Sequence, residues 1–177
     1  MLELRDVEFK VESSDGGELE IIDKISLQIE SGKFIVVTGP NGGGKSTLAK
    51  LIMGIEKPTS GQILFNGQDI TDLPIYARSK LGIGYAFQTP ARFKGMTVRK
   101  LLSLASGREL PADACSQYLT AVGLCSADYL NREVDSSLSG GEVKRIEIAT
   151  LMARNLELAI YDEPEAGIDL WSFAKLV

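Results

Sequence analysis

The sequence predicts an α/β fold in which an antiparallel β layer precedes a core of buried strands and a helical subdomain interrupts that core. Three observations support this prediction. Apolar, β-branched runs that end in polar loops occur at residues 34–38, 81–87 and 156–161, which is typical of buried strands. Residues 2–29 contain strand patterns separated by turn residues, which indicates antiparallel pairing. Between residues 97 and 131, helical patterns replace the strand patterns.

Composition narrows the possible functions. The chain has 177 residues, enough for one domain or for one domain with a subdomain. Its net charge of -5 argues against a nucleic-acid partner, because nucleic-acid-binding surfaces are normally basic. No apolar run has the length of a membrane span and no signal-peptide pattern is present, so we expect no membrane insertion and a cytoplasmic location. Cys115 and Cys125 lack a metal-ligand spacing and are expected to be reduced thiols.

The first part of the chain predicts the β layer. Strand patterns cover residues 2–11, 19–22 and 25–29, with a turn cluster at residues 13–17. A further strand is expected at residues 62–65, where the Asn-Gly pair that follows is typical of a hairpin turn.

A glycine-rich stretch, GPNGGGKST, follows the predicted strand at residues 34–38 and precedes a helical composition at residues 48–53. Glycines let backbone N–H groups surround a phosphate, and the helix presents the positive end of its dipole to the same anion. Lys45 is expected to reach the β- and γ-phosphates, and the Ser46 hydroxyl to bind Mg²⁺. The alternative is a plain strand-to-helix turn. The predicted nucleotide-binding residues are Gly39, Pro40, Asn41, Gly42, Gly43, Gly44, Lys45, Ser46 and Thr47.

The second part of the chain predicts mostly helices. A short helix or loop is expected at residues 76–80, and a final helix near Asp169. The longer helical patterns cover residues 98–102, 112–122, 127–130 and 139–154.

Polar residues at two predicted strand ends carry candidate chemistry. Asp162 and Glu163 end the strand at residues 156–161. In a phosphate-loop core, a carboxylate at Asp162 is near Ser46 and can hold Mg²⁺, while Glu163 can polarise the attacking water. Gln88 follows another buried strand and is expected to contact metal and water. The alternatives are a helix start for the acidic pair and an ordinary loop position for Gln88; the upstream loop favours catalysis.

The helix at residues 139–154 opens with LSGGE. Ser139 and Glu142 predict a capping box. Capping does not explain Gly140 and Gly141, because glycine in a helix costs about 1 kcal/mol relative to alanine. Glycines at a helix N-terminus suit close approach of a phosphate to free N–H groups. We therefore expect Ser139, Gly140 and Gly141 to contact phosphate, in addition to the capping role.

Together these motifs resemble the ATP-binding cassette (ABC) ATPase family. GPNGGGKST is similar to its Walker A motif, AFQTP to its Q-loop, LSGGE to its signature, and LELAIYDEP to Walker B with Glu163 as the catalytic glutamate; residues 165–169 occupy the D-loop position. The resemblance covers almost the whole chain. It implies a P-loop NTPase (RecA-like) core formed by residues 1–87 and 156–177, a helical subdomain at 88–155, and Mg²⁺-dependent ATP hydrolysis.

The resemblance also implies a dimer. Two copies would hold two ATP molecules head to tail, with the Walker A motif of one copy facing Ser139, Gly140 and Gly141 of the other. ATP binding would close the dimer and hydrolysis would reopen it. The cycle would drive a partner protein that binds the groove near Gln88 and the helical subdomain.

A finer resemblance is to the ATPase subunit of the SUF iron–sulfur cluster assembly system (SufC-like). It is carried by AFQTP, by SGGEVKR and by the acidic Glu165 after Walker B. Val11 stands where transporter cassettes usually carry an adenine-stacking aromatic, with Phe9 two residues before it. A SUF-type scaffold is therefore the expected partner. The alternatives are a membrane-transporter subunit and a cassette that binds nucleotide without hydrolysing it.

One part of the family pattern is absent. A further strand and a switch histidine normally follow Walker B, whereas this chain ends at residue 177 and contains no histidine. We expect that the C-terminal part is missing and that hydrolysis is impaired. A natural histidine-free variant is the alternative.

Overall fold

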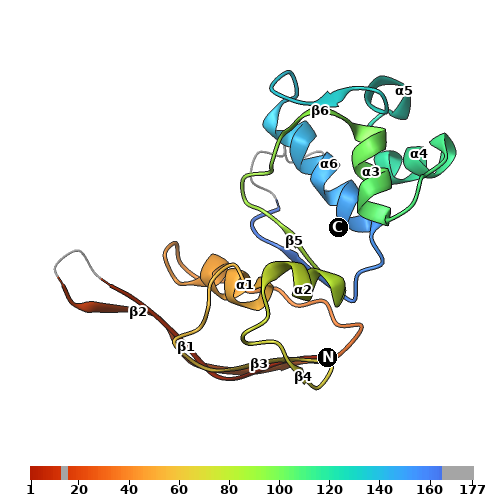
Figure 1. The fold of residues 1–177 in the computed structure, drawn as a ribbon. Coiled ribbons are helices and arrows are strands. Elements are labelled where there is room, and N and C mark those ends of the chain that lie inside the picture. The colour runs from red at the N-terminus through yellow and green to blue at the C-terminus, as the bar shows by residue number, and fades with distance from the viewer. Residues whose placement is uncertain (13–15, 165–177) are drawn as a thin grey trace. The chain divides into compact units, whose positions relative to one another are not determined.

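The computed structural model describes residues 1–12 and 16–164 (Figure 1). The chain divides into two compact units, residues 1–83 and the residues from 84 onward. The second unit therefore contains strands that the sequence assigned to the ATP-binding core. The core-and-insert division at residues 88–155 stays a prediction. The D-loop residues and the helix expected near Asp169 lie outside the described residues.

The first unit contains the predicted antiparallel layer, a four-stranded sheet in the order β2-β1-β3-β4. The strands are β1 (Leu2–Glu12), β2 (Glu18–Ile29), β3 (Ser60–Phe65) and β4 (Gln68–Asp69). Strand β2 is continuous where the sequence predicted two short strands. Between β3 and β4, Asn66 (φ 51°) and Gly67 (φ 79°) both have positive φ, as the predicted hairpin turn requires.

Helices α1 (Lys45–Met53) and α2 (Ile75–Lys80) lie on one side of this sheet (Figure 1). Helix α1 confirms the predicted helix after the glycine-rich stretch. The buried residues of α1 form an apolar face that packs against the buried side of the sheet. This packing holds the start of the helix in place.

A buried arginine ties the two helices together. The Arg78 guanidinium is 1% exposed and donates hydrogen bonds to four carbonyl oxygens, those of Leu51 (2.7 Å), Ile52 (2.9 Å), Thr71 (2.8 Å) and Leu73 (2.9 Å). Two of these oxygens belong to the last turn of α1, where carbonyl groups lack helical partners. Burial lowers the pKa of Arg78, but the four acceptors satisfy its donors.

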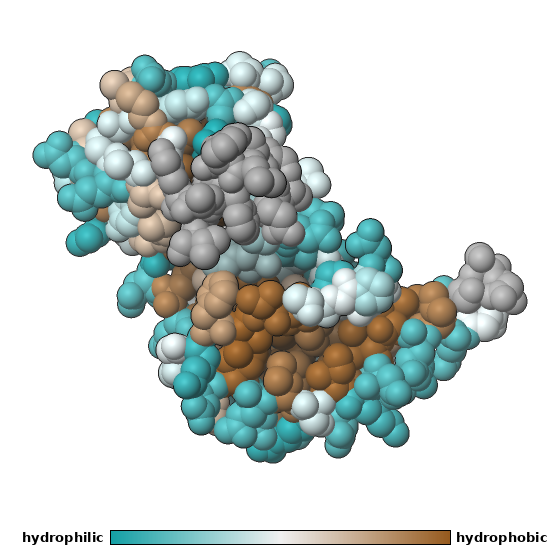
Figure 2. All heavy atoms as spheres, turned by 180° about the vertical axis from the view of Figure 1, so that it is seen from behind, coloured by the Kyte–Doolittle hydropathy of each residue, from teal (hydrophilic) through white to brown (hydrophobic). Residues whose placement is uncertain are grey.

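The buried strand expected at residues 34–38 is not formed. Among the described residues, this segment pairs with no strand, and its side chains are exposed: Phe34 by 87%, Ile35 by 50%, Val36 by 66% and Val37 by 52%. The composition suits a strand, but a strand is buried only when neighbours pair with it on both sides and layers cover its faces. Figure 2 shows hydrophobic side chains gathered on the first unit, to which this segment belongs.

In the second unit, β5 (Ile83–Ala86) pairs with β8 (Leu158–Tyr161). All four residues of β5 are buried, as predicted. Strand β8 is correct in place but not fully buried, because its residues alternate between half-buried and exposed. The Asp162 N–H donates to the Ala86 carbonyl oxygen at 3.1 Å, so the ends of the two strands stay in register.

The predicted helices fill the rest of the second unit. They are α3 (Val98–Ser106), α4 (Ala112–Ala121), α5 (Ser126–Tyr129) and α6 (Gly140–Ala153). They enclose one apolar core that includes Leu102, Leu119 and Ile146. The sequence did not predict the small antiparallel pair of β6 (Phe93–Thr97) and β7 (Glu133–Val134).

Cys115 is a buried free thiol and Cys125 an exposed one. No helix of the described ranges is long and apolar enough to cross a membrane.

Helix α6 begins with the predicted capping box. The Ser139 hydroxyl accepts from the Glu142 N–H at 3.3 Å, and Glu142 Oε2 accepts from the Ser139 N–H at 2.6 Å. The hydroxyl of Tyr129 also donates to Glu142, and Arg132 lies 3.7 Å from the same carboxylate. The Tyr129 hydrogen bond and then the two from Ser139 lower the pKa of Glu142 to about 2.

The first prediction concerns Arg78. Arg78→Met should lower the free energy of unfolding by about 3 kcal/mol or more, because each hydrogen bond from a charged donor is worth about 1.5–3 kcal/mol. Urea denaturation measures the change. Arg108→Met, at an exposed arginine, is the control and should change the free energy by less than about 0.5 kcal/mol. Equal losses in the two variants would show that the buried carbonyl contacts of Arg78 do not stabilise the first unit.

The second prediction concerns Glu142. Its pKa falls from 4.5 to about 2 on folding, so its charged form adds stability that is full above pH 4.5 and is lost as the pH falls through the folded value. Glu142→Gln should remove this part of the acid sensitivity and cost about 1 kcal/mol at neutral pH, the usual worth of a helix cap. Urea denaturation at several pH values between 2 and 7 tests it. If the free energy of unfolding fell with pH in the same way for the wild type and the variant over the acid range, the prediction would be contradicted.

Candidate functional site

The glycine-rich stretch from Gly39 to Thr47 leads into α1 and closes around Lys45. The Lys45 ammonium donates to the carbonyl oxygens of Gly39 (3.0 Å) and Pro40 (2.9 Å), and the Gly43 N–H donates to Pro40 at 3.1 Å. The loop is therefore a compact turn with a cation at its centre. Asn41 and Gly42 are exposed on its outer side.

Gly44 sets the close approach of this loop to the sheet. It has a positive φ of 80°, and a Cβ added there would lie 2.8 Å from Ile22 Cδ1 and 3.0 Å from the Ile21 carbonyl oxygen. Only glycine fits this position without a shift of β2. Gly44 is also the N-cap of α1, where no side-chain hydrogen bond caps the helix and no acidic residue lies in the first turn. Ser46 and Thr47 lie in that first turn, so its N–H groups suit an anion.

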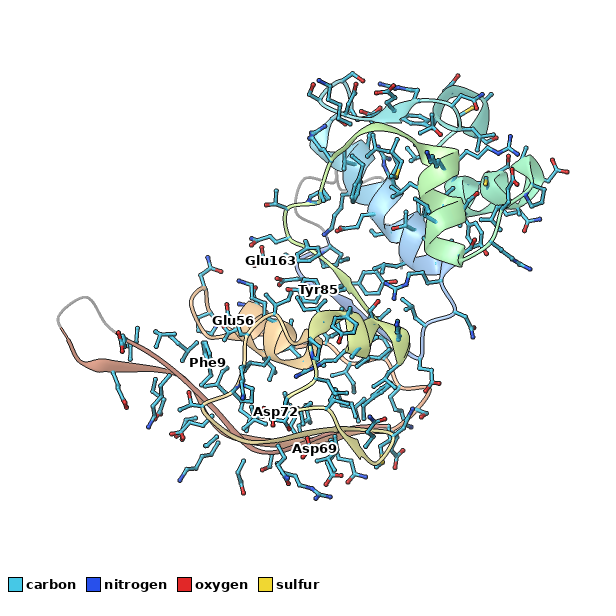
Figure 3. The ribbon with its side chains drawn as sticks, in the orientation of Figure 1. Phe9, Glu56, Asp69, Asp72, Tyr85 and Glu163 are labelled. Carbon is cyan, nitrogen blue, oxygen red and sulfur yellow. The ribbon has the colours of Figure 1, made fainter. Side chains whose placement is uncertain are left out.

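In the second unit, Gln88 and Glu163 are hydrogen-bonded to each other, while their contacts with metal and water stay predictions. Gln88 Nε2 donates to Glu163 Oε2 at 2.6 Å. Figure 3 shows where Glu163 lies relative to Tyr85. Glu163 has a left-handed φ of 46°, which costs a non-glycine residue roughly 1–2 kcal/mol. Such a backbone is typical of functional positions, and here it turns the carboxylate toward Gln88, two residues after the end of β5.

Asp162 is the buried carboxylate beside this pair. It is 8% exposed, and its Oδ2 accepts a hydrogen bond from the Tyr85 hydroxyl at 2.8 Å. Asp162, Glu163 and Gln88 all follow the paired strands β5 and β8, so three oxygen-bearing side chains gather at one end of this strand pair. Oxygen ligands of this kind are those that Mg²⁺ prefers, and the donor set fits the metal.

Two charged residues of α6 hold Phe87, the residue that precedes Gln88. The Lys144 ammonium donates to the Phe87 carbonyl oxygen, and Glu147 Oε1 accepts from the Phe87 N–H at 3.0 Å. Lys144 is fully buried and its Nζ lies 3.3 Å from Glu147 Oε2. Burial raises the pKa of Glu147, against the opposing effects of the Phe87 N–H and of Lys144. This arrangement, the Phe87 clamp, connects α6 to the start of the Q-loop.

The predicted phosphate contacts on α6 are at the surface. Ser139 and Gly140 are exposed and Gly141 is half-buried. A Cβ on Gly140 would meet nothing within 4 Å. Arg92 stabilises the segment just before α6, because its guanidinium donates to the carbonyl oxygens of Asp135 and Leu138 (2.8 Å to the latter). The start of α6 is thus fixed by its own unit and open on its outer side.

The structure adds Tyr85, Lys144 and Glu147 to the residues predicted from the sequence. Lys144 and Glu147 each follow a buried apolar residue of α6, Val143 and Ile146, so their positions beside the apolar stripe indicated burial. Tyr85 lies in a strand predicted to be buried, where a tyrosine hydroxyl needs a partner. The glycine-rich loop belongs to the first unit and the other predicted site residues to the second.

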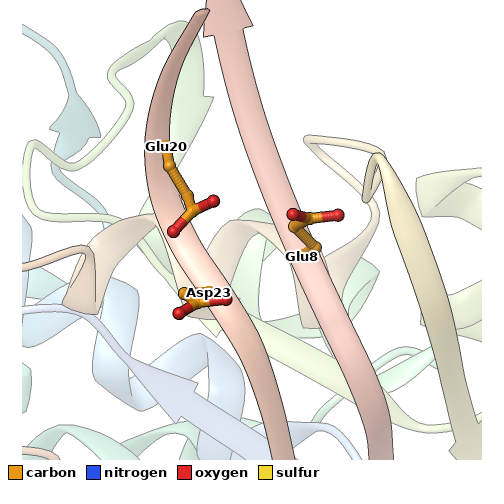
Figure 4. A group of neighbouring side chains, drawn as sticks. All are labelled: Glu8, Glu20 and Asp23. Carbon is orange, nitrogen blue, oxygen red and sulfur yellow. The ribbon is translucent and has the colours of Figure 1, made fainter.

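Two other features of the first unit do not extend the site. Phe9 is half-buried on β1 and Val11 is exposed, so adenine stacking on either stays a prediction (Figure 3). Glu8, Glu20 and Asp23 place oxygens within 4.8 Å of one another (Figure 4). Lys10 supplies their countercharge, with Nζ 2.9 Å from Glu8 and 3.7 Å from Glu20.

Comparison with known proteins identifies the family. The ABC transporter family model matches residues 22–166. The chain is 43% identical over 168 residues to the uncharacterized ABC transporter ATP-binding protein MJ0035 of Methanocaldococcus jannaschii, covering 90% of this chain and 67% of that protein. It is 37% identical to the probable ATP-dependent transporter ycf16 of Antithamnion sp., covering 87% and 66%. It is 35% identical to the sulfate/thiosulfate import ATP-binding protein CysA of Synechocystis sp., covering 89% and 44%.

Solved structures share the fold. The ATP-binding cassette MJ0796, a dimer in a post-hydrolysis state bound to ADP and Pi, superposes with a TM-score of 0.86 at 24% identity, covering 99% of this chain and 79% of that one. A bacterial Atm1-family ABC exporter with ATP bound gives a TM-score of 0.82 at 23% identity, covering 99% and 31%. The chain spans about two thirds or less of the length of the relatives above. With its motifs in family order and most of its length matched, this chain belongs to the ABC transporter family as an ATP-binding cassette, a type of domain that binds ATP with Mg²⁺.

Proposed function

We propose that this chain binds and hydrolyses MgATP and passes the resulting conformational change to a transport partner. The observation that carries the proposal is the 2.6 Å hydrogen bond between Gln88 and Glu163 beside the buried carboxylate of Asp162. A water-orienting carboxylate, an amide hydrogen-bonded to it and a metal carboxylate are the parts that phosphoryl transfer to water needs.

Each residue has a distinct role in this proposal. Backbone N–H groups of Gly42 to Thr47 surround the phosphates, and Lys45 exchanges its loop carbonyls for the β- and γ-phosphate oxygens. The Ser46 hydroxyl, Asp162 and Gln88 hold the metal, which neutralises charge that develops on the phosphates. Glu163 accepts a hydrogen bond from the attacking water and aligns it with the γ-phosphorus. Catalysis here is positioning and electrostatic stabilisation.

A second copy of the chain completes the site in this proposal. The exposed Ser139 and Gly140 and the half-buried Gly141 present their N–H groups and hydroxyl to the γ-phosphate held by the other copy. The open space beside Gly140 and the capped, rigid start of α6 support this assignment. The dimeric state of MJ0796 with ADP and Pi is consistent with it.

A membrane-transporter subunit is the partner that the relatives favour, because their names describe ABC transporter, probable transporter and sulfate/thiosulfate import proteins. The cassette then acts on the cytoplasmic side of the membrane. A SUF-type scaffold is the second candidate. It is favoured by AFQTP and SGGEVKR, whose Lys144 and neighbouring residues build the Phe87 clamp. Co-purification from the source cell with a tagged chain distinguishes the two, since one partner is a polytopic membrane protein and the other a soluble scaffold.

The third prediction tests catalysis. Glu163→Gln should lower the single-turnover rate of ATP hydrolysis by about 100-fold or more, since a positioned general base contributes about 10²–10⁴-fold. It should also trap an ATP-bound dimer, seen by light scattering with MgATP. Glu157→Gln, at an exposed carboxylate before β8, is the matched control and should hydrolyse ATP like the wild type. A wild-type chain that binds ATP without releasing phosphate would instead support a non-hydrolysing cassette.

The fourth prediction tests the loop. Lys45→Ala should weaken binding of a fluorescent ATP analogue by at least about 10-fold, because it removes a direct charge-assisted contact. Lys57→Ala removes an exposed ion pair with Asp72 (2.7 Å) and should leave binding unchanged. Undiminished binding by Lys45→Ala would place the nucleotide elsewhere.

A further inference from the structure

Tyr85 connects β5 to the proposed metal carboxylate. Its hydroxyl donates to Asp162 Oδ2 at 2.8 Å, and the two side chains are 7% and 8% exposed. The sequence motifs assign no role to this tyrosine. The fold needs the ring of Tyr85 but not its hydroxyl. The ring packs as part of the buried strand β5, and an apolar side chain could fill the same place.

We propose that Tyr85 is a positioning residue that holds the Asp162 carboxylate in the orientation in which it binds the Mg²⁺ of MgATP. The proposal rests on the proposed function, which assigns Asp162 to the metal. It adds a residue that contacts neither nucleotide nor water and acts only through Asp162.

The geometry supports this role because it holds Asp162 at two points. The Asp162 N–H donates to the Ala86 carbonyl oxygen at 3.1 Å, which places its Cα relative to β5. An aspartate side chain still rotates about two bonds, and the Tyr85 hydroxyl restricts that rotation by holding Oδ2. Hydrogen-bond partners of metal-binding carboxylates typically change metal affinity by 10- to 100-fold when removed.

The tyrosine ring itself is held independently of its hydroxyl. Its centroid lies 4.8 Å from that of Phe87, with the planes at 62°. The Tyr85 hydroxyl is the donor in its contact with Asp162, because a carboxylate oxygen can only accept. Tyr85→Phe therefore removes one hydrogen-bonding oxygen and leaves the packing in place.

The experiment measures metal binding directly. Mn²⁺ is titrated into the 177-residue chain with a non-hydrolysable ATP analogue, and bound metal is followed by the loss of the free Mn²⁺ signal in electron paramagnetic resonance. Tyr85→Phe should weaken Mn²⁺ binding by about 10-fold. Binding of the analogue in EDTA should stay as in the wild type, because the metal-free nucleotide does not use Asp162. Tyr76→Phe, at an exposed ring on α2, is the matched control and should bind Mn²⁺ normally.

A double-mutant cycle separates positioning from a general loss of structure. In an Asp162→Asn background, Tyr85→Phe should have no further effect on Mn²⁺ affinity. A 10-fold loss in that background as well, or unchanged Mn²⁺ affinity in Tyr85→Phe alone, would overturn the proposal. If the wild-type chain itself bound no Mn²⁺ with the analogue, the proposed function would fail, which is a separate result.

Discussion

The Phe87 clamp is the interaction on which the rest of the second unit depends. A buried ammonium and a half-buried carboxylate one helical turn apart satisfy the carbonyl oxygen and the N–H of one residue, Phe87. Removing Glu147 would leave the fully buried Lys144 ammonium without its ion-pair partner, which is strongly unfavourable. The clamp therefore forces α6 to stay against the end of β5. Since α6 begins with the signature residues and Phe87 lies between Ala86, the last residue of β5, and Gln88, one ion pair connects the two motifs.

Around this clamp, acidic side chains of the motifs are each held by a hydrogen-bonding partner. Tyr85 holds Asp162, Gln88 holds Glu163, and Tyr129 with Arg132 holds Glu142 beneath Ser139. Electrostatic catalysis requires groups that do not reorganise during the reaction, and these hydrogen bonds provide that rigidity before nucleotide arrives. In the first unit, contacts at the two ends of α1 provide the same kind of rigidity. Arg78 satisfies the C-terminal carbonyls of α1, and the tight fit of Gly44 against β2 fixes its N-terminus.

Much of the secondary structure was predictable because local signals determine it. The Asn66-Gly67 turn, the Ser139–Glu142 capping box and the helix after the glycine-rich loop all follow from residues close in sequence. The segment at residues 34–38 shows the limit of such reasoning. Its apolar composition predicts a buried strand, but burial depends on strands and layers contributed by distant parts of the chain, and none of the described residues pairs with it. The pair β6–β7 was missed for a related reason, since β7 has two residues and no periodicity.

The sequence by itself determined the family and the identity of the candidate site residues, because a phosphate loop and its catalytic partners need particular residue types at particular spacings. The finer assignment to a SUF-type subunit went beyond what its relatives support. Only the tertiary structure decided that Gln88 bonds to Glu163, that Tyr85 bonds to Asp162, and that Lys144 and Glu147 bind the carbonyl oxygen and the N–H of Phe87. These contacts join residues far apart in sequence, whose pairing depends on how β5, β8 and α6 pack together, and no local pattern specifies that packing.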